Sequence, residues 1–216
     1  MLSRTLRTLT LAVALALGAA LAATAAAPYG PGVPVVPPHV APTADEATDL
    51  AYMREEEKFA RDLYLNFAEA WGDAPFAYIA NAEQGHMDAM LRLLRKYRLA
   101  DPAAGNLVGE FGNPDLQVLY TALLQRGLAG ELDALKVGGL VEEVDLVDLG
   151  ISMSHTMKAD LRAAYATLAC GSRNHLRAFA AGIRAITGQS YVAQSMSQAA
   201  VDAILGQPRE RCGRAW

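Results

Sequence analysis

One glutamate and one histidine lie where the sequence pattern calls for hydrophobic side chains, and this placement constrains the fold most strongly. Glu83 and His86 are three residues apart, so on a helix they project from the same face. The flanking residues at steps of three and four are apolar, which is the buried stripe of a bundle helix. They are Phe76, Ile79, Met90, Leu93 and Tyr97. Because burying an unpaired carboxylate is very costly, the pattern predicts a compensating partner, and a metal ion shared with carboxylates of neighbouring helices is one solution.

Three more helices are expected to place a residue of the metal-ligand type in a buried stripe. These are Glu57 in a helix over about 45–71, Glu142 in one over about 131–149, and His175 in one over about 156–187. Glu55 and Glu56 precede Glu57, and because a run of acids usually marks a solvated face, we expect these two to face water. Tyr64 lies two turns beyond Glu57 and is expected to pack in the core with its hydroxyl paired inward.

A long connection is expected between the second and third long helices. The second helix, over about 75–98, is followed by a Gly- and Asn-rich loop, and Pro114 then opens a shorter helix that ends at a glycine-rich turn. Gly138 and Gly139 weaken the third long helix, and they leave room either for close helix approach or for a bound atom. The order of elements predicts an all-α fold, a bundle of two helical hairpins joined by a crossover that contains a short helix.

Residues 1–25 have the composition of a secretory signal peptide. Arg4 and Arg7 precede an apolar run over 9–22, and small residues that fit a cleavage site follow. The apolar run is short for a membrane span, so we expect no stable span after cleavage. This interpretation predicts a periplasmic or secreted protein, and the alternative is an uncleaved N-terminal anchor.

The remaining chain divides into a linker, one folded domain and a tail. Residues 26–43 are Pro-rich and cannot hold a helix, 44–188 contain the four long helices, and 189–216 form a C-terminal tail with a short helix near 197–205. Removing the leader takes two of the 19 Lys and Arg residues and leaves all 23 Asp and Glu residues, a formal net charge of about −6. No basic patch indicates nucleic acid as a partner. An oligomer is compatible with the sequence.

The ordered set of ligand-type residues on four amphipathic helices resembles the ferritin-like di-metal bundle. That architecture takes one Glu from each of two helices and a Glu-x-x-His pair from each of the other two. Residues 57–64 also resemble the first-helix motif of rubrerythrin-type proteins. More closely, the chain resembles, over about 45–185, an uncharacterised prokaryotic ferritin-like family, a domain of unknown function. The resembling segments are 52–58, 83–89, 140–145 and 171–176.

The resemblance implies a di-metal site with one departure from the family pattern. The implied ligands are Glu57, Glu83, His86, Glu142, Asp145 and His175. The fourth long helix lacks its Glu, because Ser172 stands three residues before His175. Asp145 can substitute, since it lies one turn from Glu142 on the same face. Alternatively, the site is asymmetric and open at Ser172, or only one metal ion binds well.

Ligand chemistry favours iron or manganese, because carboxylates and imidazoles without a thiolate suit these metals, and zinc is able to compete. Two ferrous ions bridged by carboxylates can pass two electrons to dioxygen or peroxide. The resemblance therefore implies two iron ions and a ferroxidase, or an oxidoreductase that reduces oxygen or peroxide. Two further hypotheses are a non-catalytic metal-binding protein and a helical interaction module with a relic metal site. The sequence indicates no organic substrate and assigns no catalytic residue.

Two cysteines in an exported chain are a natural disulfide pair, because the periplasm and the exterior are oxidising. Cys170 lies in the fourth long helix, and Cys212 lies in a tail that has no apolar periodicity to anchor it. We expect the tail to fold back along the bundle and Cys212 to bond to Cys170, with their Cα atoms within about 7 Å. The alternative is a reduced Cys170 that packs as a small hydrophobic residue.

Overall fold

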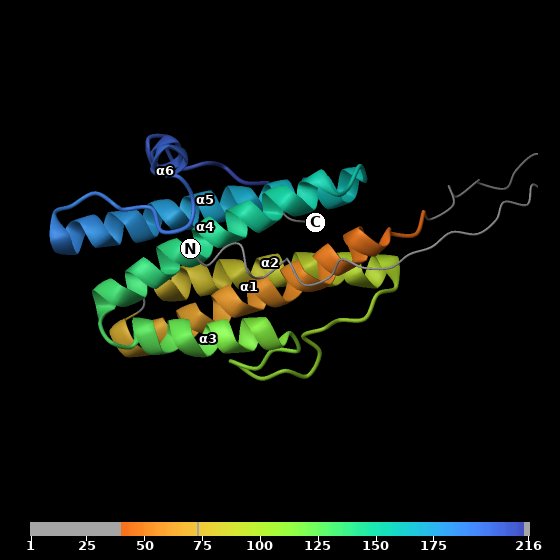
Figure 1. The fold of residues 1–216 in the computed structure, drawn as a ribbon, viewed down its shortest axis with the longest axis horizontal. Helices are drawn as coiled ribbons and strands as arrows, with labels where there is room; N and C mark the ends of the chain where they lie inside the picture. The colour runs from red at the N-terminus through yellow and green to blue at the C-terminus, as the bar shows by residue number, and fades with distance from the viewer. Residues whose placement is uncertain (1–39, 73, 214–216) are drawn as a thin grey trace, which may run out of the picture.

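The computed structural model describes residues 40–72 and 74–213, which form six α-helices and no strand (Figure 1). The helices are α1 (Ala44–Trp71), α2 (Phe76–Tyr97), α3 (Pro114–Gly127), α4 (Glu131–Ser154), α5 (Ala159–Thr187) and α6 (Gln198–Leu205). The predicted all-α helical bundle is confirmed. The expected signal peptide, and all but the end of the expected linker, lie outside the described residues.

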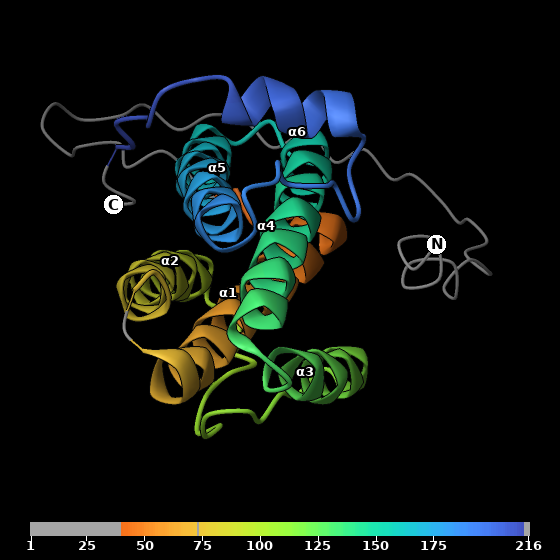
Figure 2. The same ribbon diagram turned by 90° about the vertical axis from the view of Figure 1, so that its left-hand side faces the viewer.

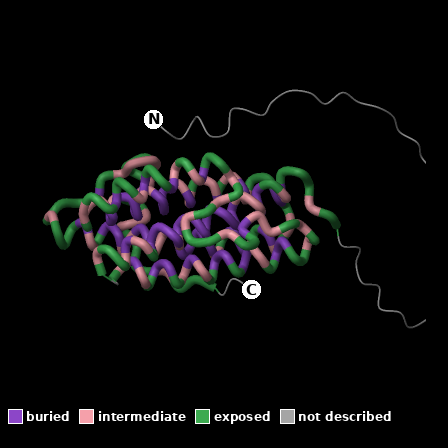
Figure 3. Tube along the Cα trace, turned by 90° about the horizontal axis from the view of Figure 1, so that it is seen from below, coloured by how far each residue is buried: buried purple, intermediate pink, exposed green. Residues whose placement is uncertain are grey.

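The four long helices form two hairpins that pack together. Helix α1 lies along α2, and α4 lies along α5, while α1 also contacts α4 and α2 contacts α5. The crossover from α2 to α4 contains α3, which packs against α1 and α4, whereas α6 packs on α5 at the opposite outer side (Figure 2). Buried residues line the inner faces of the helices (Figure 3). No helix among the described residues has both the length and the apolar character that a membrane crossing requires.

Packing moves two of the predicted helix ends. Helix α4 continues to Ser154, beyond the predicted end near Leu149, because Ser152 is also buried and extends the inner face. Helix α5 begins at Ala159 and not at Thr156. The Thr156 hydroxyl donates a hydrogen bond to Glu46 Oε1 at 2.5 Å, which ties this turn to the start of α1.

The expectation that Glu55 and Glu56 face water is wrong, because both are 5% exposed. Glu55 Oε1 accepts hydrogen bonds from the backbone N–H groups of Gly112 at 2.5 Å and Asn113 at 3.3 Å, so it fastens the crossover loop to α1. Glu56 lies within hydrogen-bond reach of Asp148 on α4. The crossover loop and α4 therefore cover a face of α1 that the acid run had suggested was solvated.

Gly138 and Gly139 accommodate aromatic side chains, which decides between the two sequence-based interpretations of this pair. A Cβ added at Gly138 would lie 2.6 Å from the ring of Phe179, and one at Gly139 would lie 2.5 Å from the hydroxyl oxygen of Tyr191. Contacts this short do not occur without a shift of neighbouring atoms. The two glycines thus allow α5 and the tail to approach α4 closely.

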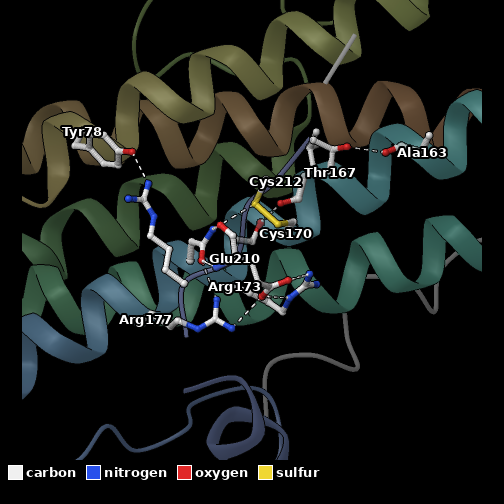
Figure 4. The surroundings of a disulfide bond; sticks show 12 residues. Tyr78, Ala163, Thr167, Cys170, Arg173, Arg177, Glu210 and Cys212 are labelled. Carbon is white, nitrogen blue, oxygen red and sulfur yellow. Dashed lines mark hydrogen bonds and ion pairs between the residues drawn. A yellow bond between two sulfur atoms is a disulfide. The ribbon is translucent and has the colours of Figure 1, made fainter. Parts of the chain in front are cut away.

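The tail folds back along α5 and is joined to it covalently. Cys212 forms a disulfide with Cys170, and their Cα atoms are 5.6 Å apart (Figure 4). One turn further along α5, Arg173 donates hydrogen bonds from Nε and Nη2 to the carboxylate of Glu210, at 2.8 and 2.5 Å. Arg177 adds a further bond to Glu210 at 2.9 Å. The tail therefore runs antiparallel to α5, and both covalent and ionic contacts hold it there.

Glu143 fixes the segment that leads from α5 to α6. It accepts hydrogen bonds from the Tyr191 hydroxyl at 2.7 Å and from the backbone N–H groups of Ser195 and Met196 at 2.6 and 2.7 Å. Glu143 is fully buried. Its carboxylate is thus used in the fold, and the neighbouring Glu142 is the residue that faces the bundle interior.

We expect Cys212→Ser to lower the free energy of unfolding by up to about 4 kcal/mol, because the disulfide closes a loop of 42 residues in the unfolded chain. Equilibrium urea denaturation of the variant and of the wild type measures the loss. A reducing agent should destabilise the wild type by the same amount and leave the variant unchanged. A wild type whose stability is insensitive to reduction would contradict this expectation.

Candidate metal centre

The predicted ligand residues lie in the middle of the four long helices, between two parts of the apolar core. On α1, Glu57 separates Met53 of one hydrophobic cluster from Ala60 of the other. On α5, His175 lies between Leu168 and Leu176 in the same way. The polar residues therefore form a layer that crosses the bundle, flanked by apolar side chains on both sides. This layer is the candidate metal centre.

Glu83 is shared by two groups of metal-ligand atoms. Glu57, Glu83 and His86 form one group, and the other combines Glu83 with Glu142 and His175. Within each group the ligand atoms lie within 4.8 Å of one another. None of these five residues is more than 8% exposed. The structure therefore brings together side chains from α1, α2, α4 and α5, as the stripes predicted.

Glu83 directs one carboxylate oxygen toward each histidine. Its Oε2 lies 2.7 Å from His86 Nδ1, and its Oε1 lies 2.7 Å from His175 Nδ1. Each imidazole nitrogen also faces a second carboxylate, since Glu57 Oε2 is 3.1 Å from His86 Nδ1 and Glu142 Oε2 is 3.5 Å from His175 Nδ1. The two halves of the centre are thus built alike around Glu83.

Several polar atoms in the centre make no hydrogen bond. They are Glu57 Oε1, Glu83 Oε1, Asp145 Oδ1 and His175 Nδ1. Glu83 Oε1 and His175 Nδ1 approach within 2.7 Å, yet their contact lacks hydrogen-bond geometry. Buried polar atoms in proteins are nearly always paired. Atoms that converge without pairing are what a set of cation ligands requires, so the residues present fit a metal ion.

Burial and like charges raise the pKa of most carboxylates in the centre. Burial raises the pKa of Glu57 to about 8, because the nearby charge of His86 offsets only part of the desolvation. Burial also raises the pKa of Asp145 well above its usual range, and the charges of Glu57 and Glu142 add to this rise. Protons must therefore neutralise part of the negative charge when no cation is bound.

Glu83 and the histidines shift in the direction expected for ion pairs. Burial alone would raise the pKa of Glu83, but the charges of His175 and His86 hold it below the usual range. Burial alone would lower the pKa of His175, but Glu83 and Glu142 raise it to about 10. The centre thus contains an ionised Glu83 between two imidazolium groups when metal is absent.

Asp145 lies against Ser172, the residue three positions before His175, where a Glu-x-x-His pair would have Glu. The Ser172 hydroxyl donates a hydrogen bond to Asp145 Oδ2, and Asp145 Oδ1 remains without a hydrogen bond. Asp145 is 6% exposed, but it belongs to neither of the two groups of mutually close ligand atoms. It is therefore held beside the centre by α5, with one oxygen available.

Two residues that support the centre had different signals in the sequence. The Tyr64 hydroxyl donates a hydrogen bond to Glu142 Oε1 at 2.6 Å, which agrees with the inward pairing expected for a tyrosine on this stripe.

Gly171, the second of these residues, was not predicted to support the centre. A Cβ at this position would lie 2.5 Å from His86 Cε1, so only glycine lets the imidazole lie against α5. A glycine in mid-helix, three residues from Asn174 and four from His175, was the available signal.

We expect Gly171→Ala to lower the free energy of unfolding by about 1–3 kcal/mol, because the added methyl group overlaps an imidazole already held by two carboxylates. Gly85→Ala on the outer face of α2 is the matched control, since nothing lies within 4 Å of its added Cβ. That change should be neutral or stabilising by up to about 1 kcal/mol. Urea denaturation of both variants checks this pair, and equal effects would refute the role given to Gly171.

Comparisons with known proteins place the chain among uncharacterised relatives. The family described as "Uncharacterized protein domain (DUF2202)" matches residues 46–208. The chain is 40% identical over 169 residues to Uncharacterized protein MJ0754 of Methanocaldococcus jannaschii, an alignment that covers 77% of this chain and 90% of the relative. The crystal structure of the hypothetical protein MJ0754 is similar, with a TM-score of 0.77 at 39% identity, over 80% of this chain and 98% of that one. The chain belongs to the DUF2202 family.

Proposed function

We propose that the chain is an exported di-metal protein of the ferritin-like type, and that iron is the metal it holds, with manganese or zinc as competitors. The observation that supports this proposal is the pair of ligand groups that share Glu83. Glu57, Glu83 and His86 would hold one ion, and Glu83, Glu142 and His175 would hold the other. Asp145 would stand beside both, steadied by Ser172.

The donor set and its charge suit two divalent cations. The described ligands are carboxylates and imidazoles, while the two cysteines are bonded to each other and offer no thiolate. Four buried carboxylates and two imidazoles form the predicted site. Two divalent cations would balance the carboxylates and displace the protons that the metal-free centre must hold.

Bound ferrous ions would supply electrons for the reduction of dioxygen or peroxide, so we propose a ferroxidase or an oxidoreductase of this class. Aromatic residues border the centre on one side. On the α3 side of the layer, the ring of Phe179 packs against those of Tyr64 and Phe76 at centroid distances of 5.1 and 5.8 Å. All three rings are fully buried. This apolar wall excludes water from that side of the centre.

Export is supported by the disulfide between Cys170 and Cys212, because such bonds persist in oxidising compartments. We therefore propose the periplasm or the exterior as the site of action. The signal peptide expected at 1–25 lies outside the described residues.

We expect the metal-free protein to bind two ferrous ions per chain under anaerobic conditions. Glu83→Gln should lose both ions, because this residue contributes to both groups, whereas His175→Ala should lose one. Asp88→Asn is the matched control, since it removes a carboxylate from the exposed face of α2 near His86. Anaerobic titration followed by metal analysis after gel filtration gives the stoichiometry.

Oxygen and peroxide consumption then separates the remaining hypotheses. Loaded wild type should consume dioxygen or peroxide faster than the same concentration of free ferrous iron, and Glu83→Gln should not. Two bound ions without consumption would leave a non-catalytic metal-binding protein. A wild type that binds no ion would eliminate both metal-dependent hypotheses and leave the interaction module.

Metal binding should release protons and tighten as the pH rises. In the metal-free protein Glu57, with a pKa of about 8, and His175, with a pKa of about 10, both carry protons at pH 7. A ligand must be deprotonated to bind a cation. Protons therefore compete with the cation for these two residues, and this competition weakens metal binding at low pH. Calorimetry in two buffers of different ionisation enthalpy measures the release. Binding without proton release, or affinity that is equal at pH 6 and pH 8, would contradict the assignment of these ligands.

A further inference from the structure

A second set of polar residues leads outward from Asp145, at the edge of the metal centre, along the seam between α1 and α4. Tyr52 and Glu56 are four residues apart on α1, and Asp145 and Asp148 are three apart on α4, so each pair shares one helix face. Helices α1 and α4 contact each other along this seam. We name these four residues the acidic seam.

Contacts connect the acidic seam from its outer end to the centre. The Tyr52 hydroxyl donates a hydrogen bond to Asp148 Oδ2 at 3.4 Å, and Glu56 lies within hydrogen-bond reach of the same aspartate. Glu56 and Asp145 are close enough for their negative charges to repel each other. The negative charges of Asp145 and Glu57 repel each other in the same way. The acids thus follow one another from Asp148 to a predicted ligand.

Burial increases along this series, and its inner members have unpaired atoms. Tyr52 and Asp148 are half-buried, while Glu56 is 5% exposed and Asp145 is 6% exposed. Glu56 Oε2 and Asp145 Oδ1 are buried and make no hydrogen bond. A carboxylate that served only the fold would be paired, as Glu55 and Glu143 are. The free oxygens of the seam therefore point to a cation as their partner.

Tyr52, at the outer end of the acidic seam, also lines a hollow of about 420 Å³. The hollow is lined by Ala47, Thr48, Ala51, Tyr52, Glu55 and Asn113. By contrast, the tail face of α5 carries Arg173 and Arg177, whose two positive charges are only partly neutralised by Glu210 (Figure 4). Positive charge on that face opposes the approach of a cation, whereas the acidic seam favours it.

We propose that the acidic seam is the route by which divalent cations pass from this hollow to the metal centre, an inference that rests on the proposed function. Glu56 occupies the middle position, between the half-buried Asp148 and the inner Asp145. Successive carboxylates replace water around the cation as it moves inward. Acid-lined clefts with low-dielectric walls concentrate counter-ions and raise association rates by about 10–10³-fold.

Stopped-flow loading of the metal-free full-length protein with Co²⁺ tests the route, because the absorption of bound Co²⁺ reports binding without any turnover. Glu56→Gln and Asp148→Asn should each slow loading by about tenfold or more, since each removes a carboxylate that would bind the passing cation, and neither residue belongs to the centre. The final number of bound ions should remain that of the wild type. Asp88→Asn removes the same charge from the exposed face of α2 and should load at the wild-type rate. Added salt should slow the wild type more than Asp148→Asn, because screening weakens a potential that this variant already lacks.

Each outcome bears on a different claim. Wild-type loading rates in Glu56→Gln and Asp148→Asn would overturn the route while two bound ions still support the proposed function. Slowing by Asp88→Asn to the same extent would also overturn it, because net charge alone would then explain the effect. A Glu56→Gln variant that binds fewer ions at equilibrium would show that Glu56 is a ligand and not part of a route. A wild type that binds no Co²⁺ and no Fe²⁺ would remove the proposed function itself.

Discussion

The structure depends on placing an ionised carboxylate, Glu83, at the centre of a helical bundle. Its position between His86 and His175 compensates part of the desolvation cost, and the opposite pKa shifts of the glutamate and the histidines express this pairing. Burial raises the pKa values of Glu57 and Glu142, the charge of Glu83 adds to this rise, and the two imidazoles offset only part of it. A buried layer with this excess of negative charge is stable only if it takes up protons or cations.

The rest of the bundle keeps this layer in one arrangement. The hydroxyls of Tyr64 and Ser172 hold carboxylates of α4, and Gly171 lets a histidine of α2 lie against α5. The disulfide at Cys170 and the buried carboxylate of Glu143 fasten the tail to α5 and α4. These contacts join helices that are distant in sequence. The ligands on α2 and α5 are therefore held in place by contacts with other elements as well as by the contact between α2 and α5.

Charge divides the surface around the centre into two unlike faces. Toward the seam of α1 and α4, acids continue outward from the centre through Glu56 to Asp148. Toward the tail, Arg173 and Arg177 are occupied by Glu210, which neutralises part of the charge and holds the tail in place. The proposed route lies on the acidic side, and the tail covers the other side with a network of ion pairs.

Helical periodicity by itself determined the number of long helices, the crossover and the positions of Glu57, Glu83, Glu142 and His175, because these follow from spacing within a single helix. The pairing of Cys170 with Cys212 was also expected, because two cysteines in an exported chain are a natural disulfide pair. Contacts between helices had no such local signal. Only the tertiary structure decided that Glu55 and Glu56 are buried, since the crossover loop and α4 cover them. Likewise, side chains from elsewhere in the chain occupy the space beside Gly138, Gly139 and Gly171. The register between helices determines which side chains these are.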